Sequence, residues 1–339
     1  MAKRRLFLAW RNLPPQNLMN RRTFLKSSLA ASAATLLANH RLTAQTQSAA
    51  DETAGKFKLG YAPHPNMLKE LGGENVIDQI KFASDQGFTA WEDNGMAGRS
   101  PAEQEEIGRT LAARKMQMGV FVAYANFTDP TFVTTDAAGQ EEILRQIRNS
   151  VDVAKRCGAK WMTVVPGSVH QQTKEYGEWN RYGGPRLAEG FQTANAIGLL
   201  RRCAEILEPH GLVMVLEPLN WYANHGGTFL QKSDQAYALC KAVNSPACKI
   251  LFDIYHQQIS EGNLNPNIDR CWDEIAYFQS GDNPGRKEPG TGEINYRNVF
   301  GHLKKKGFAG VVGMEHGKSL PGAEGERALI RAYREADRD

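Results

Sequence analysis

Short apolar runs alternate with amphipathic helical patterns from Phe57 to the end of the chain. Each run has the length of a strand, and the stretch after it has the 3.6-residue period of a helix with one buried face. The helical segments include residues 138–157 and 190–210. Eight strands are expected, at residues 58–62, 90–92 with its lead-in Phe88, 117–123, 161–165, 212–217, 249–253, 276–279 and 310–315.

Eight strand-and-helix units in roughly 280 residues predict a (β/α)8 barrel, the fold that repeats one such unit per strand. Gly87, Gly158, Gly211 and Gly307 each stand just before the next expected strand, where a residue in the left-handed conformation ends a helix. An open doubly wound sheet is the alternative, but no glycine-rich phosphate loop follows the first strand. We therefore expect one α/β catalytic domain over residues 57–339.

Four successive strands end in a side chain that can hold a divalent metal ion. These side chains are Glu217, Asp253, Gln279 and Glu315, and they are separated by 36, 26 and 36 residues. If the strands are parallel members of one closed barrel, the four side chains meet at the same rim. A single acidic residue at a strand end is often a helix N-cap or half of an ion pair, but four in register are harder to explain in that way.

Two Glu, one Asp and one Gln make an all-oxygen set of ligands, which suits a hard ion such as Mg²⁺ or Mn²⁺. Four protein ligands would leave positions for two adjacent oxygens of a hydroxy-carbonyl substrate. Glu217 and Glu315 also qualify as an acid and a base on opposite sides of that substrate. We therefore expect a divalent metal ion held by all four residues, and no other cofactor.

Further rim residues have two possible roles each. His256 lies three residues beyond Asp253 and either donates to a substrate oxygen or is satisfied by the protein. Arg286, in a run rich in Gly and Pro, either pairs with a substrate carboxylate or is solvated. Glu92 ends the second strand and contacts substrate or another rim group. His316 follows Glu315, so it should point to the other side of its strand.

The three longest loops follow the fourth, fifth and seventh strands, at residues 166–185, 218–231 and 280–295. Barrel enzymes build their sites at this end of the strands. The loops are rich in polar and aromatic side chains that suit recognition of a polar ligand: His170, Gln171, Gln172, Trp179, Asn180, Tyr182, Asn220, Trp221, Tyr222, Asn224, His225, Asp282, Asn283 and Arg286.

The charge of the chain is unevenly distributed. Residues 1–45 carry eight basic side chains and no Asp or Glu, so the rest holds 33 Lys and Arg against 37 Asp and Glu. The folded part therefore has a net charge of −4, although the whole chain is at +4. A mildly acidic domain argues against a nucleic-acid partner.

The five cysteines are an odd number and show no CxxC spacing. Four of them lie within apolar runs, which is typical of buried small hydrophobic residues. A domain of this size does not require a disulfide framework.

The N-terminal segment has the pattern of an export signal. Residues 20–26, Asn-Arg-Arg-Thr-Phe-Leu-Lys, form a twin-arginine motif, and the weakly apolar run 29–38 follows it. Ten residues cannot cross a hydrocarbon core of about 30 Å as a helix, so we expect no stable membrane insertion. We predict a leader over residues 1–45 cleaved near Ala44, a linker over 46–56, and export to the periplasm. Met19 is an alternative start, and a disordered basic tail is the alternative reading of the segment.

The same rim residues give the chain a resemblance to a known family. Residues 282–284, Asp-Asn-Pro, and 288–296, Glu-Pro-Gly-Thr-Gly-Glu-Ile-Asn-Tyr, resemble a segment of the hydroxypyruvate isomerase family almost letter for letter. Residues 217–220 and 253–256 are similar to its motifs on the fifth and sixth strands. That family belongs to the xylose isomerase-like TIM barrels, and the likeness extends from about Lys58 to the C-terminus.

The resemblance implies roles for individual residues. Glu217, Asp253, Gln279 and Glu315 would hold the metal ion, and Glu217 and Glu315 would also transfer the proton. His256 and Arg286 would bind substrate. Apart from the resemblance, Asn220 and Glu92 are further candidates for substrate binding. The Gln at the third ligand position is itself a trait of this family, because the related ketose 3-epimerases usually have His there.

Two features depart from the family pattern. The third strand reads Val-Phe-Val-Ala-Tyr-Ala at residues 120–125, where members often have a His. Trp221, Tyr222 and Ala223 stand where the epimerases place an acidic substrate contact. An exported protein would also seldom meet hydroxypyruvate, which is a cytoplasmic metabolite.

The favoured hypothesis is a metal-dependent aldose–ketose isomerase that converts hydroxypyruvate into 2-hydroxy-3-oxopropanoate through an enediolate. An exported ketose 3-epimerase or a keto-sugar lyase with the same metal site is the alternative, and a non-catalytic sugar-binding protein is the third. A DNA-repair endonuclease would need a multi-metal cluster rich in His, and too few of the eight histidines fall at strand ends. The partner is thus a small hydroxy-carbonyl or sugar substrate, and the sequence leaves a homo-oligomer open.

Overall fold

The computed structural model describes residues 55–169 and 187–338, and the compact unit begins at Gly55. Seven parallel strands form one sheet in the order β1-β9-β8-β7-β6-β5-β4, and β2 pairs with β3 in a second, parallel pair. The last strand therefore pairs with the first, as the curved sheet of a barrel requires. The strands are β1 (Gly60–Ala62), β2 (Ala90–Trp91), β3 (Gln117–Met118), β4 (Val122–Asn126), β5 (Trp161–Pro166), β6 (Val213–Leu216), β7 (Cys248–Asp253), β8 (Ile275–Gln279) and β9 (Val311–Gly313).

All eight expected strands are present, but the third is interrupted between β3 and β4. A Cβ atom at Gly119 would lie 2.4 Å from the hydroxyl of Tyr277, so the chain leaves regular pairing where that side chain enters the barrel. The backbone N–H of Glu92 donates to the carbonyl of Pro63 at 3.0 Å and joins the ends of β2 and β1. The barrel prediction is confirmed, and the open doubly wound sheet is wrong.

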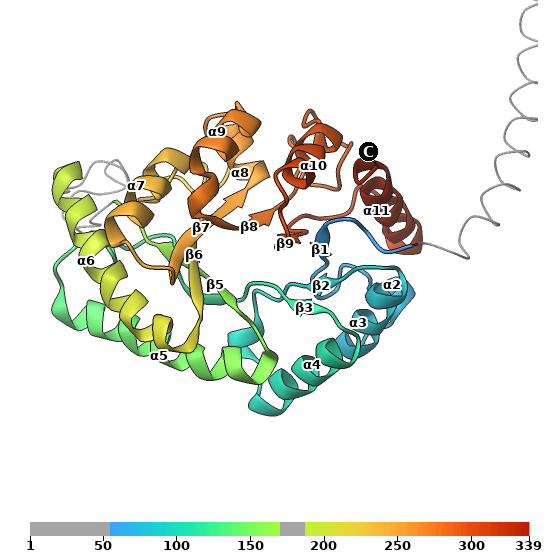
Figure 1. The fold of residues 1–339 in the computed structure, drawn as a ribbon, viewed down its shortest axis with the longest axis horizontal. Helices are drawn as coiled ribbons and strands as arrows, with labels where there is room; N and C mark the ends of the chain where they lie inside the picture. The colour runs from blue at the N-terminus through green and yellow to red at the C-terminus, as the bar shows by residue number, and fades with distance from the viewer. Residues whose placement is uncertain (1–54, 170–186, 339) are drawn as a thin grey trace, which may run out of the picture. The chain divides into compact units, whose positions relative to one another are not determined.

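Helices surround the strands on the outside (Figure 1), and most strands are followed by one. The four glycines expected before strands, Gly87, Gly158, Gly211 and Gly307, have φ angles of 86°, 74°, 65° and 73°, which confirms that prediction. Among the described residues, no helix is long and apolar enough to cross a membrane. The helices are α2 (Lys69–Gly72), α3 (Val76–Asp85), α4 (Pro101–Ala113), α5 (Ala137–Cys157), α6 (Glu189–Leu207), α7 (Ser233–Val243), α8 (Ile254–Ser260), α9 (Leu264–Cys271), α10 (Tyr296–Lys305) and α11 (Gly322–Ala336), with short 3₁₀ turns at Met96–Gly98, Glu208–His210 and Trp272–Glu274.

Alternate residues of each strand belong to two separate apolar clusters. Met214 and Leu216 pack in the large cluster that joins strands to helices. Val213 and Val215 belong to a small cluster with Leu251, Tyr277 and Val311, which fills the inside of the barrel. Because side chains alternate along a strand, residues 217, 253, 279 and 315 share the inward direction of this second cluster. All five cysteines are free and buried, whereas burial was predicted for four of them.

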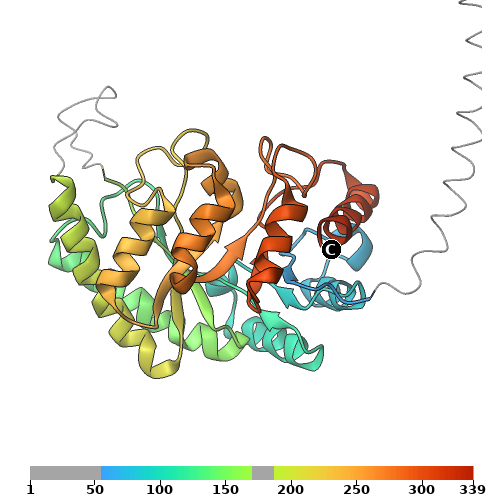
Figure 2. The same cartoon turned by 45° about the horizontal axis from the view of Figure 1, so that its top comes forward.

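The loop after β8 is held by one buried carboxylate. Figure 2 shows loops rising at the top of the turned barrel. The loop after β8 carries Arg286, whose side chain reaches Asp253 and Glu315 at the strand ends. Asp282 is fully buried, and its two oxygens accept four backbone hydrogen bonds of 2.8 to 3.1 Å. A carboxylate with several N–H donors is a strong anchor for a loop. The donors are the backbone N–H groups of Asn283, Gly290, Gly292 and Ile294.

Asp282→Asn should loosen this loop, because the amide group replaces one acceptor oxygen with a donor. We expect the backbone amides of residues 283–294 to exchange with solvent deuterium about tenfold faster, since a hydrogen bond to a charged group contributes roughly 1.5–3 kcal/mol. Peptide-level hydrogen exchange measures this. Glu293→Gln, an exposed change in the same loop, is the control, and equal protection in all three proteins would contradict the anchor.

Candidate active site

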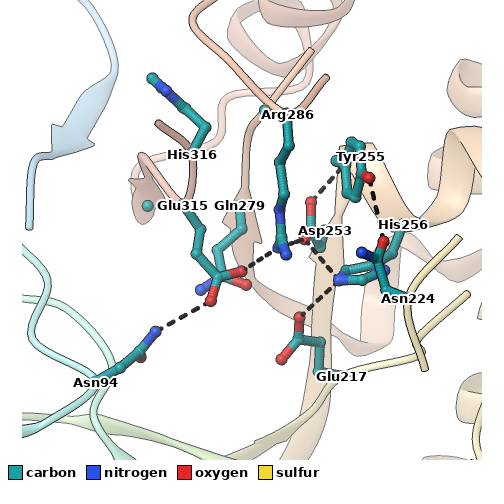
Figure 3. A network of polar contacts seen from close by, with 12 residues as sticks. Asn94, Glu217, Asn224, Asp253, Tyr255, His256, Gln279, Arg286, Glu315 and His316 are labelled. Carbon is teal, nitrogen blue, oxygen red and sulfur yellow. Dashed lines mark hydrogen bonds and ion pairs between the residues drawn. The ribbon is translucent and has the colours of Figure 1, made fainter. Parts of the chain in front are cut away.

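Four inward-facing side chains from neighbouring strands meet at the carboxyl ends of β6 to β9. Glu217 follows β6, Asp253 and Gln279 end β7 and β8, and Glu315 lies two residues beyond β9. Asp253 is paired with Gln279 and Gln279 with Gly313 in the parallel ladder, which sets the ends of β7, β8 and β9 side by side. Figure 3 shows their polar ends turned toward one another.

Arg286 reaches into this cluster from the loop that Asp282 anchors. Its Nη2 lies 2.9 Å from Asp253 Oδ2 and 2.5 Å from Glu315 Oε2, and its guanidinium lies over the ring of Tyr255 at 4.7 Å. The alternative of a solvated arginine is therefore wrong. Burial alone would lower the pKa of Arg286, but the neighbouring carboxylates raise it above the usual value, so the side chain stays charged.

The carboxylates of the site repel one another, and three of them, Glu92, Glu217 and Asp253, are buried, whereas Glu315 is partly exposed. Burial, and then the charge of Glu315, raise the pKa of Glu217 well above its usual value and that of Glu92 to about 8. Burial raises the pKa of Glu315 to about 7 and that of Asp253 as well, although Arg286 opposes both shifts. Four acidic groups thus face one guanidinium, and the site favours protons or a further cation.

Several atoms of the site fit a bound cation. Oxygen atoms of Glu217 and Asp253 lie within 4.8 Å of each other and of a ring nitrogen of His256, and this is the one group of its kind found in the described part of the chain. The two carboxylates are the ligand candidates of this group. Gln279 Oε1 is buried and has no hydrogen-bond partner among the described residues. An unpartnered buried carbonyl oxygen is costly, and a hard cation would satisfy it. The donor set therefore fits a divalent ion of the Mg²⁺ or Mn²⁺ type.

The surroundings of His256 make it a donor rather than a metal ligand. Its Nδ1 faces two N–H groups of Asn220, the side-chain amide at 2.7 Å and the backbone at 3.3 Å. Burial, and then Arg286, lower the pKa of His256 well below its usual value, so the ring is neutral. With Nδ1 accepting, the proton is on Nε2, which faces Asp253 Oδ2 at 3.5 Å and Glu217 Oε1 at 3.8 Å.

Two residues that were expected to contact substrate form hydrogen bonds within the protein instead. Asn220 is completely buried, and its side chain bonds His256, Asn224 and the backbone of Ala223. Glu92 is 1% exposed and accepts from Tyr277 and Gln279, which matches the alternative of a contact with another rim group. These contacts indicate that both residues act through their neighbours.

Sequence reasoning missed two residues of the site. Asn94 donates to Glu315 Oε1 at 3.1 Å, although it lies two residues beyond Glu92 and could have been found from that spacing. Tyr277 looks like an ordinary core aromatic in the sequence, but its hydroxyl bonds Glu92 inside the barrel. His316 points away from the cluster in Figure 3, as strand alternation predicts, and its Nε2 lies 2.8 Å from the hydroxyl of Tyr333.

The predicted recognition loops are only partly described. Trp221 donates to the carbonyl of Thr228 and packs on the core, whereas Tyr222 is 82% exposed. Asp282, expected among the ligand contacts, is the buried loop anchor instead. The remaining expected contacts of the loop after the fourth strand, His170, Gln171, Gln172, Trp179, Asn180 and Tyr182, lie outside the described residues.

Comparison with solved structures supports this architecture. A protein described as an AP endonuclease, family 2 from Brucella melitensis superposes with a TM-score of 0.65 over 80% of this chain and 98% of its own, at 23% identity. This likeness shows the fold. Residues 18–38, which precede the described part, match the twin-arginine translocation pathway signal sequence.

Comparison of sequences is more specific. Residues 80–336 match the xylose isomerase-like TIM barrel family. The hydroxypyruvate isomerase of Escherichia coli is 37% identical over 123 residues, which is 36% of this chain and 47% of that protein. The 2-oxo-tetronate isomerase of Pectobacterium atrosepticum is 32% identical over 247 residues, or 71% of this chain and 86% of that protein. The chain therefore belongs to the xylose isomerase-like TIM barrel family and, within it, to the isomerases similar to those named for hydroxypyruvate and 2-oxo-tetronate.

Proposed function

We propose that the protein is a metal-dependent isomerase of small 3-hydroxy-2-oxo carboxylates, with the conversion of hydroxypyruvate into 2-hydroxy-3-oxopropanoate as the simplest case. The observation that supports this most is the convergence of Glu217 and Glu315 with one arginine and an amide oxygen that has no hydrogen-bond partner in the described part of the chain. The relatives named for hydroxypyruvate and 2-oxo-tetronate act on acids in which a hydroxyl group stands next to a carbonyl group.

Glu217, Asp253, Gln279 and Glu315 would hold the ion, which we propose is Mg²⁺ or Mn²⁺. A divalent ion at this place supplies positive charge that stabilises negative charge on the oxygens of the substrate. The protein's own part is to fix the four ligands. Strand pairing fixes Asp253 beside Gln279, and it fixes Gln279 beside Gly313, two residues before Glu315.

Arg286 and His256 would bind the substrate. Arg286 already makes two contacts to carboxylate oxygens, which supports a role in pairing with the carboxylate of an α-keto acid. His256 directs Nε2–H toward the carboxylate cluster, where it would donate to a substrate oxygen. Asn220 is the positioning residue for His256, because its two N–H groups hold Nδ1 as an acceptor.

Proton transfer would use Glu217 and Glu315, which come from strands three places apart around the barrel. One carboxylate removes the proton from the carbon that bears the hydroxyl group, and the electron pair forms the enediolate. The other carboxylate delivers a proton to the former carbonyl carbon. The proton of the original hydroxyl group passes to the former carbonyl oxygen, and the original hydroxyl oxygen becomes the new carbonyl. Each carboxylate acts at hydrogen-bonding distance from its own carbon.

A second candidate keeps the site and enlarges the substrate. Phe127 is 44% exposed and stacks on His225 at 4.9 Å, and His225 lies 5.3 Å from His256. This row of rings leads from the surface to the site and would suit the face of a sugar. A ketose 3-epimerase or a keto-sugar lyase is therefore the alternative activity.

The setting of the enzyme follows from its N-terminal segment. The match of residues 18–38 to a twin-arginine signal supports export in folded form. We place a leader at residues 1–45, a linker at 46–56 and the barrel from 57 onward, and we infer a periplasmic enzyme. Self-association into a homo-oligomer is compatible with this scheme.

Removal of metal tests the proposed function directly. The metal-stripped protein should not catalyse exchange of substrate C–H with deuterated water, and added Mn²⁺ or Mg²⁺ should restore that exchange. Nuclear magnetic resonance follows the exchange for hydroxypyruvate, 2-oxo-tetronate and a panel of ketoses and keto-glycosides. Faster exchange with hydroxypyruvate or 2-oxo-tetronate than with the sugars supports the isomerase, and the reverse order supports the alternative. If no compound shows metal-dependent exchange, both activities are wrong.

Glu217→Gln and Glu315→Gln should each lower the exchange rate by about 10²- to 10⁴-fold, because each removes one proton-transfer group. Glu293→Gln is a matched change at an exposed position and should leave the rate unchanged. Rates are measured at saturating Mn²⁺ so that weaker metal binding does not limit them. A variant that keeps more than half of the parent rate would contradict the role of its carboxylate.

A further inference from the structure

Glu92 crosses the inside of the barrel to reach Gln279. It follows β2, yet its Oε1 accepts from Gln279 Nε2 of β8 at 2.9 Å, and its Oε2 accepts from the hydroxyl of Tyr277 at 2.7 Å. The Tyr277 oxygen accepts in turn from the backbone N–H of Val120 at 3.3 Å. The phenol hydrogen is thus directed at Glu92, and both carboxylate oxygens are used as acceptors.

The barrel leaves space for this contact at one position of β9. A Cβ atom on Gly313 would lie 1.9 Å from Glu92 Oε2 and 3.0 Å from Gln279 Cγ. Residue 313 also shares the inward direction of Val311 and Glu315. A glycine here lets the Glu92 carboxylate pass beside β9 and meet the amide on the next strand.

The contact decides which end of the Gln279 amide faces the site. An amide has a donor end and an acceptor end, and a carboxylate in its ionised form, which only accepts, binds the donor end. Because Glu92 takes Nε2, Oε1 is left facing away from it, buried and unpartnered among the described residues. The reversed amide would set two acceptor oxygens against each other.

We propose that Glu92 is a positioning residue that holds the oxygen of Gln279 toward the metal site and so raises the affinity of the site for its ion. This inference rests on the proposed function, since it needs a metal ion bound by Gln279. Partners that orient metal ligands typically change metal affinity by about 10- to 100-fold when they are removed.

The test measures the dissociation constant of Mn²⁺ on metal-stripped protein, by calorimetry and by paramagnetic resonance of free Mn²⁺. Glu92→Asp keeps the charge but is one methylene too short to reach both Tyr277 and Gln279. Glu92→Gln keeps the shape but has a single acceptor oxygen for two donors. The double variant Glu92→Gln with Gln279→Glu exchanges the two side chains and keeps the net charge of the parent. The amide at position 92 then donates to the carboxylate at position 279 and accepts from Tyr277. The second oxygen of that carboxylate again faces the site.

We expect Glu92→Asp and Glu92→Gln each to bind Mn²⁺ at least about tenfold more weakly, and the double variant to return to within about threefold of the parent or to bind more tightly. Glu324→Asp, the same shortening at an exposed position of α11, should bind as the parent does. Thermal unfolding of the metal-free proteins checks that each variant is folded. If Glu92→Asp is not folded, the test depends on Glu92→Gln and on the double variant.

Parent-like affinity of Glu92→Asp, or a double variant as weak as Glu92→Gln, would overturn the positioning role while leaving the metal site in place. Asp253→Asn tests whether the metal site exists, separately from the positioning role of Glu92. If the parent binds Mn²⁺ no better than Asp253→Asn does, the proposed metal site itself is wrong, and the inference about Glu92 is wrong with it.

Discussion

Several carboxylates of like charge are buried at one end of a barrel, and the rest of the site is arranged around that constraint. Glu92, Glu217, Asp253 and Glu315 point inward because strand alternation gives them no other direction. Buried like charges need hydrogen-bond donors or cations near them. Arg286 supplies one cation between two carboxylates, and Tyr277 and Gln279 supply donors to a third. The charge that remains is the physical reason for proposing a divalent ion.

The residues that hold the site in place, Asp282 and Asn220, are buried polar groups that form several hydrogen bonds each. Asp282 uses both oxygens to hold the loop of Arg286, and Asn220 fixes which nitrogen of His256 carries the proton. These groups lie behind the reacting region and do not face solvent. A site held in this way keeps its donors and acceptors in place before substrate arrives, which lowers the reorganisation needed during the reaction.

The row of aromatic rings beside the site could accommodate substrates of different sizes with the same chemistry. Tyr255 lies beneath the guanidinium of Arg286, and Phe127 and His225 continue the row of rings toward solvent. A carboxylate would bind at the arginine end, whereas a sugar ring would extend along the exposed rings. The choice between a small keto acid and a larger keto sugar thus depends on groups outside the proton-transfer region.

The sequence alone determined the barrel, the limits of most strands and the convergence of residues 217, 253, 279 and 315, because period, glycine stops and strand ends are local properties that repeat along the chain. It could not determine which acidic groups face substrate. Glu92 and Asp282 resemble rim ligands in the sequence, yet both are buried supports, and Tyr277 resembles a core residue, yet it bonds a carboxylate. Those roles depend on contacts between residues up to 187 positions apart. Only closure of the barrel brings the end of β2 across the interior from β8, and so only the tertiary structure decided them.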